Sequence, residues 1–68
     1  MENLVRFTFN YTKTVVVKNV NSVSKSSDNS GNPTIDVLYT SNEKETIKYG
    51  ITDLRDSDFN SFKNVFMS

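Results

Sequence analysis

The residues best suited to metal chemistry form a short acidic run near the C-terminus. The run Asp56-Ser57-Asp58-Phe59-Asn60 matches the first half of a calcium-binding loop, in which side-chain oxygens alternate along the chain. The match then fails, because Ser61 occupies the glycine position and Met67 the position of the bidentate glutamate. We predict no metal site, and expect Asp56 and Asp58 to favour a helix start, where the helix dipole stabilises negative charge.

The chain lacks the side chains that activate most nucleophiles. It contains no histidine and no cysteine, so its hydroxyl and amine groups have no histidine as general base. The two glycines, Gly31 and Gly50, are too far apart for a phosphate-binding loop. Asp36 is expected to point outward beside a lysine or arginine, and Glu43 and Glu45 to be solvated in a turn. The sequence predicts no catalytic residue and no cofactor, and therefore a protein that is not an enzyme.

One aromatic pattern is typical of sheets that stack nucleic-acid bases. In the segment Arg6-Phe7-Thr8-Phe9-Asn10-Tyr11, aromatic rings occupy every second position. The same alternation is typical of a half-buried strand, and Phe7 and Phe9 are the best candidates for the core. The chain has 8 basic and 8 acidic residues, which disfavours the basic surface of a nucleic-acid binder. Burial of the two rings is the favoured interpretation, and nucleic acid is not the expected partner.

These residues must be positioned by short strands, of which the first two form a hairpin. The alternation over 5–11 predicts one strand, and the valine- and threonine-rich segment 13–20 predicts a second. A three-residue loop at 11–13 would pair Phe9 with Val15 and Phe7 with Val17, which places all four on one face.

A bend is expected after the second strand, because Val17, Val20 and Val23 are spaced by three. The spacing indicates a bulge leading into a third strand over 20–25, with one helical turn as the alternative. The segment 24–33 has no apolar side chain except Pro33, so it is expected to be a flexible polar loop.

Two further strands and a helix complete the expected elements. Apolar alternation over 34–40 and 46–51 predicts a second hairpin around a turn at 41–44. Phe59, Phe62 and Phe66 lie at i, i+3 and i+7, which indicates a helix from Ser57 to Met67 with Ser57 as N-cap. Such a short helix is marginal alone, so its phenylalanine stripe is expected to cover the sheet.

The predicted fold is α+β and mainly β. It is one domain over residues 1–68: an antiparallel meander of four or five strands, as a curled sheet or partial barrel, with one C-terminal helix packed on the sheet. A chain of 68 residues buries only a small core, for which oligomerisation is a common remedy. The expected inner face consists of Val5, Phe7, Phe9, Val15, Val17, Ile35, Val37, Tyr39, Ile47, Tyr49, Ile51, Phe59, Phe62 and Phe66.

The outward-facing residues are the candidate partner-binding surface. Leu4, Val16 and Leu38 fall on the nominally exposed face, where a cluster of the three would form an apolar patch. The other candidates are polar: Arg6 and Lys18 on the same face, and Lys25, Asp28 and Asn29 in the 24–33 loop.

The leading hypothesis is a small non-enzymatic protein that binds another protein. The abundance of residues with AT-rich codons fits a phage or mobile-element factor that inhibits or redirects a host protein. Two alternatives stay open: an oligomeric binder or sponge for a small nucleotide signal, and a single-strand nucleic-acid-binding β-domain. The N-terminal sequence lacks the basic start and apolar run of a signal peptide, and no run approaches the ~20 apolar residues of a membrane span. The predicted location is therefore the cytoplasm, that of the host for a phage protein, without membrane contact.

Overall fold

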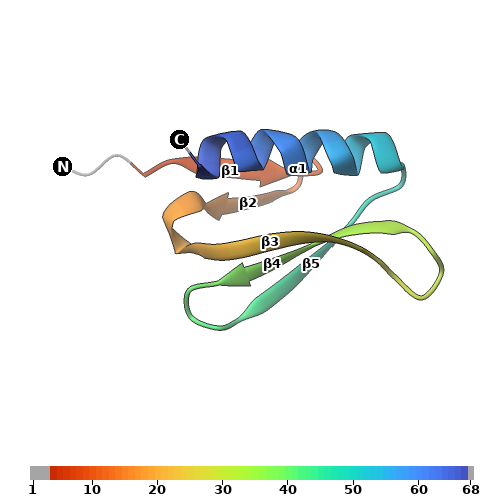
Figure 1. The fold of residues 1–68 in the computed structure, drawn as a ribbon, viewed down its shortest axis with the longest axis horizontal. Helices are drawn as coiled ribbons and strands as arrows, with labels where there is room; N and C mark the ends of the chain where they lie inside the picture. Colours follow the sequence, from red (N-terminus) through yellow and green to blue (C-terminus); the bar gives the residue numbers. More distant parts are fainter. Residues whose placement is uncertain (1–3, 68) are drawn as a thin grey trace.

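A computed structural model of the chain describes residues 4–67, which form five strands, one short 3-10 turn and one helix (Figure 1). The strands are β1 (Arg6–Phe9), β2 (Lys13–Val16), β3 (Val20–Ser27), β4 (Pro33–Tyr39) and β5 (Lys44–Lys48). The 3-10 turn η1 (Val17–Asn19) joins β2 to β3, and helix α1 (Thr52–Phe66) follows β5. All strand pairs are antiparallel, which confirms the predicted mainly β, α+β fold with one C-terminal helix.

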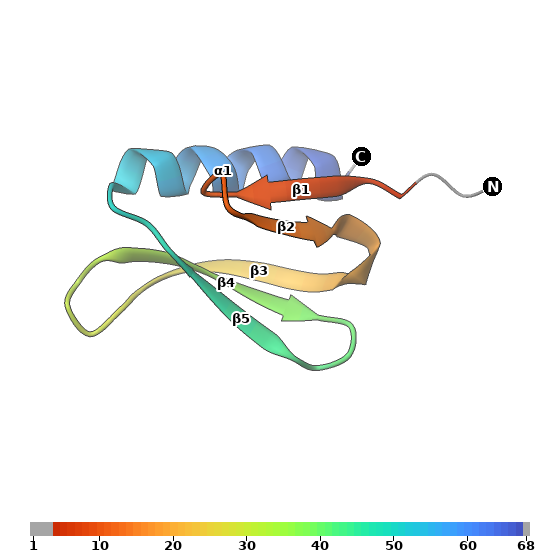
Figure 2. The same cartoon turned by 180° about the vertical axis from the view of Figure 1, so that it is seen from behind.

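The strands form two sheets. One contains β1 and β2, and the other contains β3, β4 and β5 in chain order. The meander is therefore interrupted at η1, where the chain passes from one sheet to the other (Figure 2). Helix α1 packs against β3, β4 and η1, and its phenylalanine rings reach β1. The helix thus covers the sheets, as predicted, while the proposed partial barrel stays a prediction.

The first hairpin has a different register from the predicted one. Phe7, not Phe9, is paired with Val15, because the turn begins at Asn10, one residue earlier than expected. Asn10 and Tyr11 adopt positive φ angles of 50° and 60°, a conformation that asparagine tolerates better than most residues. A shift of two residues leaves every side chain on its original face, so the predicted inner face survives the error.

The segment between the sheets contains both features that the valine spacing indicated. Val17–Asn19 forms the helical turn, and the β3–β4 register shifts between Val20 and Ser22, as at a bulge. Strand β3 then continues to Ser27 and β4 begins at Pro33, so the connecting loop spans 28–32 and not 24–33. Polar residues extend β3 because strand pairing uses the backbone, and most side chains of this edge strand are exposed.

Helix α1 begins at Thr52, so the predicted start at Ser57 is wrong. Ile51 is the extended N-cap residue and makes no side-chain capping hydrogen bond. Asp53 lies in the first turn, but Asp56 and Asp58 lie inside the helix and do not act at its N-terminus as expected. Their carboxylates bind groups of neighbouring elements, which accounts for two acidic residues at these positions.

The core lies between the helix and the two sheets. Phe9, Ile35, Val37 and Phe62 are fully buried at its centre. The remaining buried apolar residues are Val15, Val17, Val20, Ile47 and Tyr49. Val5, Ile51 and Phe66 were expected inside but have exposed fractions of 55%, 61% and 36%. Val5 precedes β1, Ile51 precedes α1 and Phe66 ends it, so the apolar pattern extends beyond the parts of the elements that are covered.

Candidate interaction surfaces

Exposed apolar side chains gather at one end of the molecule. Seven large apolar residues are exposed within 4–67, and five of them lie just before β1 or at the end of α1: Leu4, Val5, Val65, Phe66 and Met67. Figures 1 and 2 both place the start of β1 beside the end of α1. The ring of Phe66 stacks on that of Phe62 with centroids 5.4 Å apart, so this surface continues into the core. We call these five residues the terminal patch.

A cleft of about 460 Å³ lies between β2 and the β4–β5 hairpin. Three successive β2 residues, 14–16, line one wall, and Tyr39, Glu43 and Glu45 line the other. We call this hollow the β2 cleft. The end of β2 and the turn between β4 and β5 lie at the same end of the molecule as the start of β1 and the end of α1 (Figure 1).

An ion pair joins the two sheets beside the β2 cleft. Lys13 Nζ lies 2.8 Å from Glu45 Oε2, and the Tyr39 hydroxyl donates to Glu45 Oε1 at 3.1 Å. The hydrogen bond to Glu45 raises the pKa of Lys13, and the bond from Lys13 lowers the pKa of Glu45. Burial, followed by the Glu45 carboxylate, raises the pKa of Tyr39. Glu45 was expected in a turn, but it lies in β5, where it pairs with Lys13 of the other sheet.

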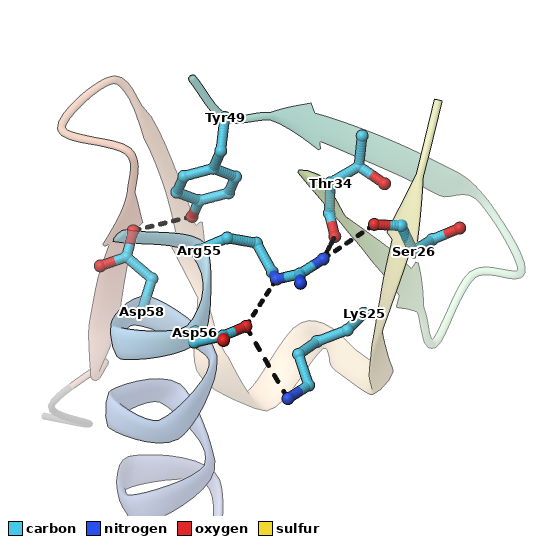
Figure 3. Close-up of polar contacts among 7 residues, drawn as sticks. All are labelled: Lys25, Ser26, Thr34, Tyr49, Arg55, Asp56 and Asp58. Atoms are coloured by element: carbon cyan, nitrogen blue, oxygen red, sulfur yellow. Dashed lines mark hydrogen bonds and ion pairs between the residues drawn. The ribbon is translucent and has the colours of Figure 1, made fainter. Parts of the chain in front are cut away.

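A second polar centre attaches the first half of α1 to the three-stranded sheet (Figure 3). Arg55 Nη1 donates to the carbonyl oxygens of Ser26 at 2.8 Å and Thr34 at 3.4 Å, and Arg55 Nε donates to Asp56 Oδ1 at 2.7 Å. Lys25 Nζ lies 3.8 Å from the same Asp56 oxygen. Sequence reasoning missed Arg55, because its two carbonyl acceptors belong to Ser26 and Thr34, which are far from it in sequence.

A third polar centre attaches the same helix to the first hairpin and to the end of β5. Asp58 Oδ2 accepts a hydrogen bond from the Tyr49 hydroxyl at 2.7 Å and one from the backbone N–H of Asn10 at 2.8 Å. Asn10 Nδ2 donates to the Lys48 carbonyl at 2.9 Å. Burial, and then the Asp58 carboxylate, raise the pKa of the Tyr49 hydroxyl. The carboxylates of the calcium-like run thus serve structural contacts.

The residues predicted to bind a partner lie on different elements. Arg6 and Val16 are opposite one another in the β1–β2 ladder, and Leu4 precedes β1. Lys18 lies in η1, whereas Leu38 lies on β4 of the other sheet. Leu4 belongs to the terminal patch, Val16 lines the β2 cleft, and Leu38 belongs to neither surface. The three residues are therefore not assigned to one common patch.

The residues assigned to the polar loop also separate. Lys25 lies in β3, where its ammonium group is 5.2 Å from the centroid of the Phe59 ring, so its placement in a loop is wrong. Asp28 shapes the 28–32 turn, because its carboxylate accepts from the amides of Ser30 and Asn32 at 2.9 Å each. These bonds, that from Asn32 first, lower the pKa of Asp28. Asn29 is exposed at the turn.

The remaining sequence hypotheses concern Asp36 and the aromatic strand. Asp36 lies 3.6 Å from Lys44 Nζ and accepts from the Thr46 hydroxyl at 2.9 Å, which confirms the predicted pairing with a cation. Phe9 is fully buried and Phe7 is half-buried against it, with ring centroids 4.8 Å apart. The rings that would stack bases are therefore largely part of the core.

Comparison of the chain with protein-family models, with curated proteins and with solved structures found no significant match. Within residues 4–67, α1 falls short of the length and apolarity that a bilayer-spanning helix requires. The functional conclusion therefore depends on the surfaces described above.

Proposed function

We propose that the chain is a small non-enzymatic interaction protein whose terminal patch binds an apolar surface of another protein. The observation that supports this proposal is the gathering of five exposed apolar residues, from both ends of a 68-residue chain, at one end of the folded molecule. Contiguous exposed apolar groups on small proteins mark protein-binding sites, because water contact with them is unfavourable. Burying such surface contributes roughly 25 cal/mol per Å².

Met67 and Val5 would contribute most to binding at this patch. Their exposed fractions are 75% and 55%, so each has much apolar surface to remove from water. Phe66 adds a ring that is fixed against Phe62, which lowers the entropy cost of ordering it in a complex. Methionine adapts its shape to a partner surface, which suits it to the outer part of such a contact.

The other candidate functions have less support. The charged groups that line the β2 cleft are the carboxylates of Glu43 and Glu45, which would repel the phosphates of a nucleotide signal. A base-stacking role would require Phe9 to leave the core, where it is fully buried. We therefore retain protein binding as the proposed function.

The proposal is tested by placing charge in the patch. The double variant Val5→Glu/Met67→Glu should remain folded, because both side chains are exposed, and should lose a partner that the unmodified chain captures from a low-GC bacterial lysate. Ile51→Glu is the matched control, since Ile51 is 61% exposed but precedes α1 at the opposite end of the helix. Captured proteins would be identified by mass spectrometry.

The opposite results are equally clear. A partner that the double variant still captures as well as the unmodified chain does would exclude the terminal patch as its binding site. Light scattering should accompany the capture. A dimer that becomes a monomer in the double variant would identify a second copy of this chain, and not a different protein, as the occupant.

A further inference from the structure

The outer edge of β2 presents unpaired backbone groups. The amide of Val17 donates to the carbonyl of Val5 at 2.9 Å, so this pair is hydrogen-bonded, and hydrogen-bonded pairs alternate with non-hydrogen-bonded pairs along an antiparallel ladder. The N–H and C=O groups of Thr14 and the N–H of Val16 consequently point away from β1 without a partner in the ladder, whereas the C=O of Val16, the N-cap residue of η1, accepts the first bond of that turn. The side chains of Thr8 and Thr14 meet at 2.8 Å, as expected for the closer, non-hydrogen-bonded pairs.

This edge faces the β2 cleft. Successive side chains of a strand point to opposite faces, so a cavity on one face would contact alternate residues only. Thr14, Val15 and Val16 all line the cleft, which shows that it runs along the backbone edge of β2. Within residues 4–67, β2 has β1 as its single strand neighbour, so this edge is available for pairing.

The opposite wall favours a cation. Glu43 and Glu45 line the cleft, and no lysine or arginine is among its lining residues. Lys13 binds Glu45 Oε2 at the side nearer the β1–β2 turn, whereas Glu43 accepts a bond only from the Ser41 hydroxyl, at 3.3 Å, among the described side chains. A basic side chain of a segment bound in the cleft would therefore have within the lining a carboxylate, that of Glu43, without a cationic partner among the described residues.

We propose that the β2 cleft binds an extended segment of a partner protein, with a lysine or arginine, as an added strand along β2. The N–H and C=O groups of Thr14 and the N–H of Val16 would pair with alternate residues of the guest segment, as in other recognition by strand addition. The basic side chain of the guest would reach Glu43. This inference concerns a different surface from the terminal patch and does not depend on it.

Val16→Pro tests the backbone pairing. Val16 has φ −87°, close to the value that proline imposes, and its N–H is not used in the β1–β2 ladder, so the fold should tolerate the ring. Val16→Pro removes the backbone N–H of residue 16 from the edge of β2, and Val16→Thr is the control variant that keeps this N–H. Circular dichroism and thermal melting would show that both variants are folded.

The probe is a fluorescein-labelled peptide, acetyl-Thr-Val-Lys-Val-Thr-amide, measured by anisotropy. We expect Val16→Pro to weaken its binding about five- to tenfold relative to Val16→Thr, the usual effect of losing one hydrogen bond. Replacing the peptide lysine by glutamate, or Glu43 by glutamine, should weaken it roughly threefold. Amide NMR shifts should be largest at Thr14 and Val16.

Three results would overturn the proposal. They are equal affinities of the two Val16 variants, equal affinities of the lysine and glutamate peptides, and absence of binding at millimolar peptide. The Val5→Glu/Met67→Glu variant should bind the peptide normally. Failure of the terminal patch as a protein-binding site would therefore be distinguished from failure of the β2 cleft.

Discussion

Arg55 shows how one side chain fixes the position of a helix. Its side chain is 14% exposed, and its guanidinium group binds the carbonyl groups of Ser26 and Thr34, which are opposite one another in the β3–β4 ladder. Both bonds are assisted by the charge of the donor, and the planar group is fixed from its other side by Asp56. Arginine meets this geometry with a rigid fork of donors that lysine lacks.

Replacing Arg55 should therefore destabilise the fold even when the charge is kept. We expect Arg55→Lys to lower the free energy of unfolding by about 1–2 kcal/mol and Arg55→Ala by about 2–3 kcal/mol, because carbonyl groups lose charged donors. Urea denaturation followed by circular dichroism measures both. Arg6→Ala is the control, since Arg6 is exposed on β1 and should change stability by less than about 0.5 kcal/mol. Equal stability of Arg55→Lys and the unmodified chain would contradict this role.

Tyr11 has an unfavourable backbone conformation, and its exposed side chain gains little from burial to offset that cost. It is 84% exposed and has φ 60°, in the left-handed region that costs a non-glycine residue about 1–2 kcal/mol. Tyr11→Gly should raise the free energy of unfolding by about 0.5 kcal/mol, after allowance for the greater flexibility of glycine in the unfolded chain. Tyr11→Val should lower it by about 1 kcal/mol, because β-branching makes this conformation worse. Thermal melting would contradict the argument by giving the reverse order.

At the level of elements, the strands were predictable and the helix start was not. Two-residue alternation identifies β1, β4 and β5, because each places alternate apolar residues in the core, as Ile35 and Val37 of β4 do. The Phe59, Phe62 and Phe66 stripe identifies the last turns of α1, which pack through apolar rings. The first turns are held by polar contacts of Arg55 and Asp58. The spacing of apolar residues cannot reveal such contacts, so it did not predict where the helix begins.

The link between α1 and β5 predicts a dependence on alkaline pH. Burial raises the pKa of the Tyr49 hydroxyl above its usual value near 10, so the folded state keeps a proton that the unfolded state loses. The stability that Tyr49 contributes is therefore complete below about pH 10 and falls as the pH rises further.

Tyr49→Phe isolates this contribution. The variant loses the bond to Asp58, and we expect a free energy of unfolding about 1–2 kcal/mol lower at pH 7. Because phenylalanine does not titrate, the difference between variant and unmodified chain should shrink between about pH 10 and 11. Denaturation curves at both pH values measure it. A difference that stays constant over this range would show that the Tyr49 hydroxyl does not link folding to pH.

At the level of the whole molecule, one ring connects the helix to the two-stranded sheet. Phe62 is fully buried, and its centroid lies 5.3 Å from those of both Phe7 and Phe9. Phe62→Ala should cost about 3–5 kcal/mol, which is comparable to the total stability expected for a domain of this size. The variant should be largely unfolded at 25 °C by circular dichroism, and Phe62→Leu should stay folded with a lower melting temperature. A cooperative native melt for the alanine variant would contradict this central position.

The candidate surfaces were only partly predictable because they depend on how distant segments meet. Leu4 was expected outside, but Val5 and Phe66 continue apolar patterns and were expected in the core. The β2 cleft requires Val16 of one sheet to lie across from Glu43 of the other, and a periodic pattern within one strand cannot specify that distance. Sequence therefore identifies the elements, while their arrangement creates the surfaces.

The division into two sheets also has a consequence for the order of folding. The pairs of β3–β4–β5 join residues close in sequence, whereas the contacts of α1 with Asn10 and Ser26 close loops of 48 and 29 residues. Loop closure becomes more costly with length, and local contacts form faster. The three-stranded meander should therefore form before the helix and first hairpin dock on it. Because its two walls belong to these separate units, the β2 cleft would be completed only in the final step of folding.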